Sequence, residues 1–228
     1  MTGRSVGCVV PAFNAAPTVP GVVAAIRDAI PRAFVVVVDD GSTDGTGDAV
    51  RPLADATVRF HENRGKGVAL REGFARALER GCDRIVTIDA DGQHDPRDAV
   101  RLLEALADAD LAVGARRRAP GQMPLGRRIT NRLSAAAVGR CVGQPVADAQ
   151  SGFRAMRSHV AATITPAGTR YEFETEFLIC AARRGYRIAY VSIPTRYPRI
   201  VPSRFRALRD SARIIGTIWR LRRPGAAV

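Results

Sequence analysis

The stretch R-I-V-T-I-D-A-D-G-Q-H-D-P-R-D-A-V-R-L-L-E-A-L-A, residues 84–107, contains the pattern that decides the fold. It begins with a short apolar run from Arg84 to Ile88, rich in β-branched residues, which predicts a buried strand. An acidic turn follows, and the spacing of apolar side chains over residues 97–107 predicts an amphipathic helix. Strand, polar turn and helix in this order are the repeating unit of a parallel α/β sheet.

The same unit recurs along the first half of the chain. Further strands are predicted at Ser5–Val10, Phe34–Val38, Thr57–Phe60 and Leu111–Val113, and further helices at Val19–Ile30, Thr46–Leu53 and Val68–Arg80. Beyond Gly114 the pattern is less regular; it predicts strands near 152–156 and 186–193 and helices near 127–142, 171–184 and 203–222. We therefore expect an α/β fold over residues 1–228, with a mostly parallel central sheet covered by helices on both faces. Ligands of such sheets bind beyond the carboxyl ends of the strands, so the loops after the strands are candidate sites.

Composition narrows the class of protein. The chain has 228 residues, of which 46% are hydrophobic and 25% charged, which excludes disordered, collagen-like and disulfide-scaffold proteins. Its apolar runs fall short of the roughly 18 residues that cross a bilayer, and Val6–Val10 is too short for a signal-peptide core. The cysteines are scattered without a C-x-x-C pair, which predicts free thiols in a reducing compartment: Cys8, Cys82, Cys141 and Cys180. We expect a cytoplasmic protein.

Charge is divided unevenly along the chain. The 35 basic and 22 acidic side chains give a net charge of +13. Residues 1–110 hold 17 acidic and 13 basic side chains, a net −4, whereas residues 111–228 hold 5 and 22, a net +17. A nucleic-acid-binding protein is one interpretation of this excess. However, the arginines are not interleaved with aromatic residues and no DNA-binding motif is present, so we expect no nucleic-acid partner.

The acidic turn D-A-D-G-Q-H-D-P, residues 89–96, predicts a metal site. Asp89, Asp91 and Gln93 are spaced two apart after an extended segment, so their oxygen atoms can converge on Mg²⁺ or Mn²⁺. The alternative is that these acids only cap the next helix. Asp95, followed by Pro96, fits that alternative, but it leaves Asp89 and Asp91 unexplained.

Two other loops carry candidate ligand-binding residues. In V-V-D-D-G-S-T-D-G-T, residues 37–46, adjacent acids could accept hydrogen bonds from ribose hydroxyls or base N–H groups; the alternative is a polar turn. In N-R-G-K-G, residues 63–67, glycines allow close approach of a ligand, and Arg64 and Lys66 could hold an anion. The second loop matches neither the Walker A pattern nor G-x-G-x-x-G, which disfavours a P-loop NTPase and a nicotinamide dehydrogenase.

These three motifs, together with P-A-F-N at 11–14 and D-A-Q-S-G-F-R at 148–154, resemble in sequence and order the family-2 glycosyltransferases of the Rossmann-like GT-A fold. The resemblance covers about residues 6–194 and is strongest to the dolichyl- or polyprenyl-phosphate mannose and glucose synthases. It implies that Asp89, Asp91 and Gln93 hold Mg²⁺ or Mn²⁺ on the diphosphate of a nucleotide-sugar donor. It also implies a nucleotide site near Pro11, Phe13, Asn14, Asp39, Asp40, Ser42, Gly65 and Lys66.

The resemblance further implies a polyprenyl phosphate acceptor bound by arginines. Arg116 follows the fifth predicted strand, and Arg128 and Arg132, four residues apart on the next predicted helix, could share one anion, with Ser134 close by. The alternative is a solvated arginine face. A phosphate monoester is largely dianionic at neutral pH and needs no general base, and the family implies inversion at the sugar.

A hydroxyl acceptor on a polysaccharide, glycolipid or protein would instead need a carboxylate base. The candidates are Asp148, Glu174 and Glu176, but Y-E-F-E-T-E-F at 171–177 lacks the Glu-Asp pair of hydroxyl-transferring relatives, so we favour the phosphate. A nucleotidyltransferase, which would form diphosphate from a nucleoside triphosphate, is a further alternative.

The chain divides into three parts under this interpretation: residues 1–115 for the nucleotide sugar, 116–200 for the acceptor and 201–228 as an amphipathic basic helix. That helix has an apolar stripe of Phe205, Leu208, Ala212, Ile215 and Trp219 beside a basic one of Arg206, Arg209, Arg213 and Arg220. It could lie on the inner face of the cell membrane as a peripheral contact, or its apolar stripe could cover the body of the protein.

Overall fold

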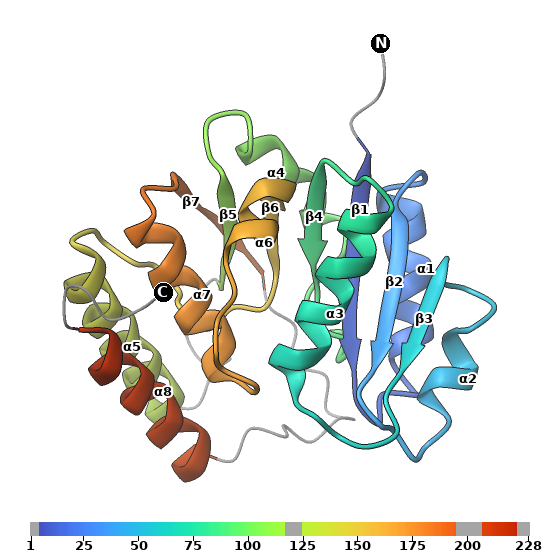
Figure 1. Ribbon diagram of the computed structural model, residues 1–228, viewed down its shortest axis with the longest axis horizontal. Coiled ribbons are helices and arrows are strands. Elements are labelled where there is room, and N and C mark those ends of the chain that lie inside the picture. Colours follow the sequence, from blue (N-terminus) through green and yellow to red (C-terminus); the bar gives the residue numbers. More distant parts are fainter. Residues whose placement is uncertain (1–4, 117–124, 195–206, 223–228) are drawn as a thin grey trace.

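The computed structural model describes residues 5–116, 125–194 and 207–222, with the backbone alone over 125–133 and 207–211. Its centre is a seven-stranded sheet of order β3-β2-β1-β4-β6-β5-β7 (Figure 1). The strands are β1 (Val6–Ala12), β2 (Phe34–Asp39), β3 (Ala56–Arg59), β4 (Arg84–Thr87), β5 (Leu111–Arg116), β6 (Arg154–Arg157) and β7 (Ile188–Ile193). All neighbouring strands are parallel except that β6 runs antiparallel to β4 and β5. The predicted α/β class with a mostly parallel sheet is confirmed.

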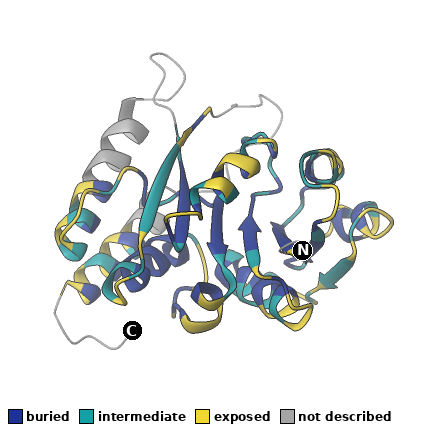
Figure 2. Ribbon diagram, turned by 90° about the horizontal axis from the view of Figure 1, so that it is seen from above, coloured by how far each residue is buried: buried dark blue, intermediate teal, exposed yellow. Residues whose placement is uncertain are grey.

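Helices cover both faces of the sheet, as Figure 1 shows. They are α1 (Val19–Ala29), α2 (Thr46–Val50), α3 (Lys66–Glu79), α4 (Asp98–Ala105), α5 (Leu125–Val142), α6 (Ser158–Thr163), α7 (Glu172–Arg183) and α8 (Ala207–Leu221). The valines of β2 show why both faces are covered, because successive side chains in a strand point to opposite sides. Val35 and Val37 are buried in the core that includes residues of α1 and α4, and Val36 and Val38 in the core that includes residues of α3, α6 and α7. Coloured by burial, the strands form a largely buried layer between helices whose outer sides are exposed (Figure 2).

Two features of the second half did not follow from the sequence pattern. Helix α6 was not predicted, because it is a single short segment directly after β6. The direction of β6 was not predicted either, because apolar periodicity identifies a strand but not its orientation. The reversal matters for the site: the beginning of β6, rather than its end, lies at the edge of the sheet where β4 ends.

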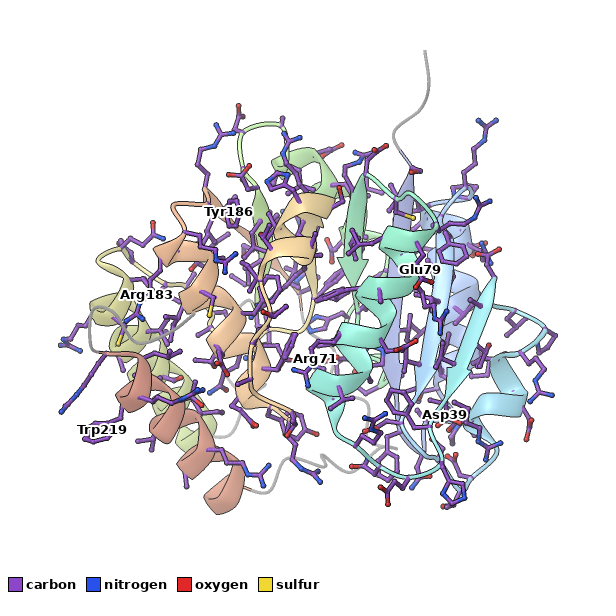
Figure 3. All side chains as sticks on the ribbon, in the orientation of Figure 1. Asp39, Arg71, Glu79, Arg183, Tyr186 and Trp219 are labelled. Atoms are coloured by element: carbon purple, nitrogen blue, oxygen red, sulfur yellow. The ribbon has the colours of Figure 1, made fainter. Side chains whose placement is uncertain are left out.

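Helix α8 lies beside α5 and α7 at one side of the molecule (Figure 1). Ile214 and Leu221 are buried, whereas Ile215 and Trp219 of the predicted apolar stripe are 66% and 59% exposed. Figure 3 shows Trp219 at the outer side of this helix. The described part of the stripe therefore does not cover the body of the protein; Phe205 and Arg206 lie outside the described residues. None of the described helices is long and apolar enough to cross a membrane.

The cysteines are free thiols, as predicted. Cys8, Cys82 and Cys180 are buried and Cys141 is half-buried. Burial raises the pKa of the Cys8 thiol to about 12, and the neighbouring Cys82 adds to this effect. Cys8 is therefore a packing residue rather than a nucleophile.

Candidate active site

The topology brings the predicted loops to one edge of the sheet. Asp39 ends β2, Asp89 follows β4 by two residues, and Arg116 ends β5. Because β6 is antiparallel, the segment before it, D-A-Q-S-G-F, reaches the same edge. The hydroxyl of Thr87 in β4 donates a hydrogen bond of 2.7 Å to the carbonyl oxygen of Gly152, which fixes this segment beside Asp89.

A partly buried ion cluster joins three elements at this edge. The ammonium of Lys66, at the first residue of α3, lies 2.6 Å from Oδ1 of Asp89 and 2.5 Å from Oε1 of Glu174 on α7. Burial lowers the pKa of Lys66, but the two carboxylates outweigh burial and raise it, so the amine stays charged. In the same way burial raises the pKa of Asp89, but Lys66 outweighs it and the net shift is downward. Asp89 is therefore an anion at neutral pH.

Asp91 differs from Asp89 in its surroundings. Burial, and after it the negative charge of Asp89, raise the pKa of Asp91 to about 6. Its Oδ1 accepts a hydrogen bond of 3.0 Å from the backbone N–H of Gln93, and Gly92 between them has a left-handed φ of 72°. This tight turn places the backbone of Gln93 against the Asp91 carboxylate.

The chemistry of these donors fits a hard divalent cation. Two mutually repelling carboxylates are present, and a cation between them would relieve the repulsion that raises the pKa of Asp91. Among the described residues no three His, Cys, Asp or Glu side chains form a metal-binding group. The residues that the sequence predicts as ligands are two carboxylates and an amide, a combination that suits Mg²⁺ or Mn²⁺ because these ions retain water and bind substrate phosphates.

Asp39, Ser42 and Asn14 form a hydrogen-bonded network between the loops after β1 and β2. The Ser42 N–H donates to Oδ1 of Asp39 at 2.9 Å, and the Asn14 N–H donates to the Ser42 hydroxyl at 2.7 Å. Oδ2 of Asp39 is buried without a hydrogen bond and lies 3.5 Å from Nε of Arg59. Asn14 has a left-handed φ of 45°, and Phe13 before it is half-buried. Pro11 is buried within β1 opposite Val38.

Asp40 has a different role from its neighbour. Its carboxylate accepts hydrogen bonds from the backbone N–H groups of Arg64 and Gly65 and from the side chain of Asn63. Burial raises its pKa, against the effect of these hydrogen bonds. Asp40 thus fixes the N-R-G-K-G loop. Gly65 is needed in that loop, because its φ is 103° and a Cβ would lie 2.3 Å from the carbonyl oxygen of Thr169.

Arg116 is held by an acid from the segment before β6. Its Nε and Nη2 donate to the two carboxylate oxygens of Asp148 at 2.7 and 3.0 Å. Burial acts to raise the pKa of Asp148, but Arg116 outweighs it and the net shift is downward. Arg128 and Arg132 lie four residues apart on α5; their side chains are outside the described residues. The buried Ser134 hydroxyl accepts a hydrogen bond from the Gln150 amide, which ties α5 to the same segment.

The three glutamates at the start of α7 face different partners. Glu172 accepts hydrogen bonds from the N–H groups of Thr169 and Arg170. Glu176 accepts from those of Ala167 and Gly168 and pairs with Arg220 of α8 at 3.0 Å. Glu174 alone faces Lys66.

Comparison with known proteins identifies the family of this chain. The family described as Glycosyl transferase family 2 matches residues 8–165. The chain belongs to this family. It is 36% identical over 196 residues to an undecaprenyl-phosphate mannosyltransferase of Micrococcus luteus, covering 81% of each chain. It is 32% identical over 198 residues to a polyprenol monophosphomannose synthase of Mycolicibacterium smegmatis, covering 81% of this chain and 75% of that one.

Solved structures of low identity confirm the GT-A fold. Glucosyl-3-phosphoglycerate synthase from Mycobacterium tuberculosis in complex with UDP matches 96% of this glycosyltransferase and 80% of its own chain, with a TM-score of 0.76 and 24% identity. The same enzyme with Mn²⁺, UDP and glucosyl-3-phosphoglycerate matches with a TM-score of 0.72 and 23% identity. At this identity the likeness shows the fold alone.

Two residues of the site were not identified from the sequence. Gly152 had no assigned role, although a Cβ at this position would lie 2.6 Å from Nζ of Lys66 and 2.8 Å from Oδ2 of Asp89. Arg154 is buried and donates to the carbonyl oxygens of Ala149 and Ser151. Their positions inside the D-A-Q-S-G-F-R motif were the sequence signal that could have identified them.

Proposed function

We propose that this glycosyltransferase moves a hexose from a nucleoside-diphosphate sugar, of the GDP-mannose or UDP-glucose type, to a polyprenyl phosphate with inversion at the anomeric carbon. Two relatives more than 30% identical over most of the chain are named for mannose transfer to undecaprenyl phosphate and for polyprenol monophosphomannose synthesis. The proposal places the donor on residues 1–115 and the acceptor on residues 116–200, within one catalytic domain.

The engagement of all three candidate bases carries the choice of acceptor. Asp148 is paired with Arg116, Glu174 with Lys66, and Glu176 with Arg220 and two backbone N–H groups. Each of these carboxylates would have to leave its partners before it could contact an acceptor hydroxyl. A phosphate acceptor avoids this difficulty, because its second pKa of about 6 leaves it mostly dianionic at neutral pH.

The acidic turn after β4 supports the assignment of the donor site. Asp89, Asp91 and Gln93 would hold Mg²⁺ or Mn²⁺, which when bound neutralises charge on the departing diphosphate. Gly65 permits the close approach of the Thr169 carbonyl oxygen to the loop that contains Lys66, and Lys66 places a positive charge beside Asp89. Asp39, Ser42, Asn14, Phe13 and Pro11 would line the nucleotide, while Asp40 positions the loop that contains Gly65.

Arginines of the second half would hold the acceptor phosphate. Arg116 is oriented by Asp148, and Arg128 and Arg132 lie on α5, the helix that follows β5 along the chain. Fixed guanidinium groups orient the attacking oxygen and offset its charge, so the protein contributes position and electrostatic stabilisation rather than proton transfer.

Helix α8, within residues 201–228, would contact the membrane that holds the acceptor. Its exposed Ile215 and Trp219 lie on the same helix as Arg213 and Arg220, and Arg222, the residue after the helix, lies over the Trp219 ring at 4.8 Å. Apolar side chains beside cations suit the surface of an anionic bilayer. The proposed location is peripheral, at the inner face of the cell membrane.

A paired acceptor assay tests this function. The purified chain is incubated with Mn²⁺ or Mg²⁺, a panel of radiolabelled UDP and GDP sugars, and either polyprenyl phosphate or the matching polyprenol. We expect organic-phase label with polyprenyl phosphate but not with the polyprenol. We also expect one nucleotide sugar to give more label than the others. Equal label with the polyprenol would favour the hydroxyl-acceptor alternative, and diphosphate release from nucleoside triphosphates would favour a nucleotidyltransferase.

A further inference from the structure

We infer that Glu174 is a positioning residue that, through Lys66, keeps Asp89 available to a divalent cation. The inference rests on the proposed function in one respect, namely that Asp89 is a metal ligand. It assigns Glu174 neither the proton transfer that a general base would perform nor contact with the substrate.

The contacts place Lys66 between two anions. Its Nζ lies 2.6 Å from Oδ1 of Asp89 and 2.5 Å from Oε1 of Glu174. Glu174 is 3% exposed, so solvent screens this contact little. An ammonium so close to Asp89 competes with any metal ion for that carboxylate, because both are attracted by the same negative charge.

Glu174 changes the net charge of the cluster. Asp89 and Lys66 alone sum to zero, which would leave Asp89 with little net attraction for a cation. With Glu174 the cluster has a net charge of −1, because Lys66 is shared between two carboxylates. The buried guanidinium of Arg154 also interacts electrostatically with Glu174 and Asp89, so a neutral side chain at residue 174 would leave both Lys66 and Arg154 acting on Asp89. Counting Arg154 adds the same positive charge to every variant, so the difference that Glu174 makes is unchanged.

Three variants test the inference by Mn²⁺ binding, measured by electron paramagnetic resonance with the metal alone and no donor present. Glu174→Gln should bind Mn²⁺ about tenfold more weakly than the wild type, because one negative charge is removed near the ion. Lys66→Met should bind at least as tightly as the wild type. Lys66→Met combined with Glu174→Gln should recover most of the loss, because the net charge returns to −1. A merely structural role for Glu174 would not be rescued by a second buried substitution.

Glu176→Gln is the matched control. Glu176 is on the same helix and 4% exposed, but it contacts Ala167, Gly168 and Arg220 rather than Lys66. We expect it to lower the thermal unfolding temperature and to leave Mn²⁺ affinity unchanged.

The outcomes separate this inference from the proposed function. Failure of the wild type to bind Mn²⁺ without donor would overturn the inference, whereas the proposed function is overturned by the paired acceptor assay. Wild-type affinity in a folded Glu174→Gln chain, or a double variant as weak as Glu174→Gln, would overturn the inference alone. Should Glu174→Gln not fold, Lys66→Met decides by itself: weaker Mn²⁺ binding than the wild type would overturn the inference.

Discussion

Gly152 lies against the carboxylate of Asp89 so closely that a Cβ at this position would be 2.8 Å from Oδ2 and 2.9 Å from Oδ1. The same Cβ would be 2.6 Å from Nζ of Lys66. All three neighbours are ends of side chains, which can move without unfolding the chain. The close approach is thus a property of the site rather than of the core.

Gly152→Ala should accordingly reduce transfer activity while the protein remains folded. The methyl group would displace Asp89 and Lys66, and a displacement near 1 Å at a reacting centre costs about a hundredfold in rate. Activity with a saturating donor and circular dichroism measure the two effects. Full activity of Gly152→Ala would show that Asp89 need not keep its described position.

Gly73→Ala should destabilise the fold instead. A Cβ at Gly73 on α3 would lie 2.2 Å from Cγ1 of Val9 in β1, and Val9 is fully buried. Such overpacking costs about 1–3 kcal/mol in the free energy of unfolding. Gly21→Ala in α1 is the control, because its Cβ would meet nothing within 4 Å and alanine stabilises a helix by about 0.5–1 kcal/mol. Urea unfolding of both variants compares them; equal stability would contradict the close contact between α3 and β1.

The Arg116–Asp148 pair should make the free energy of unfolding depend on pH in the acid range. Arg116 lowers the pKa of Asp148 below its ordinary value of 3.8, so the pair stabilises the folded chain above that pH and is lost as pH falls through the lowered value. Asp148→Asn should cost about 2 kcal/mol at neutral pH, the worth of a hydrogen bond to a charged group. In urea unfolding from neutral pH to below 3.8, the difference from wild type should shrink only at the acid end. A constant difference would exclude the pair as its cause.

Substitution of the exposed apolar residues of α8 should weaken membrane binding. Ile215→Ser with Trp219→Ser removes two large side chains that are 66% and 59% exposed. Loss of one buried apolar side chain is worth about 1.5–3 kcal/mol, so binding to vesicles containing anionic lipid should fall by tenfold or more. Leu53→Ser, at another exposed apolar residue, is the control. Equal vesicle co-sedimentation of all three proteins would exclude α8 as the contact.

The parts of the structure that follow from local sequence were predictable. Apolar runs identified all seven strands of the sheet, and the spacing of Asp89, Asp91 and Gln93 located the acidic turn. The order of the sheet and the reversal of β6 depend on long-range pairing, for which the sequence pattern has no signal.

The partners of the charged residues could not be predicted, for the same physical reason. Lys66 and Glu174 are far apart in the sequence and meet only when α3 and α7 pack together. Asp39 and Asp40 look equivalent as adjacent acids, but only Asp40 is bonded to the loop that contains Gly65. The apolar stripe of α8 was predicted from its spacing, but which side of the helix is exposed depends on its contacts with α5 and α7.

The most direct test of the central claim is metal-dependent transfer of labelled sugar to polyprenyl phosphate by the wild type and by Asp91→Ala. We expect organic-phase label from the wild type with Mn²⁺ or Mg²⁺, and its loss both in excess chelator and in a folded Asp91→Ala chain. Full transfer by Asp91→Ala in excess chelator would contradict the account.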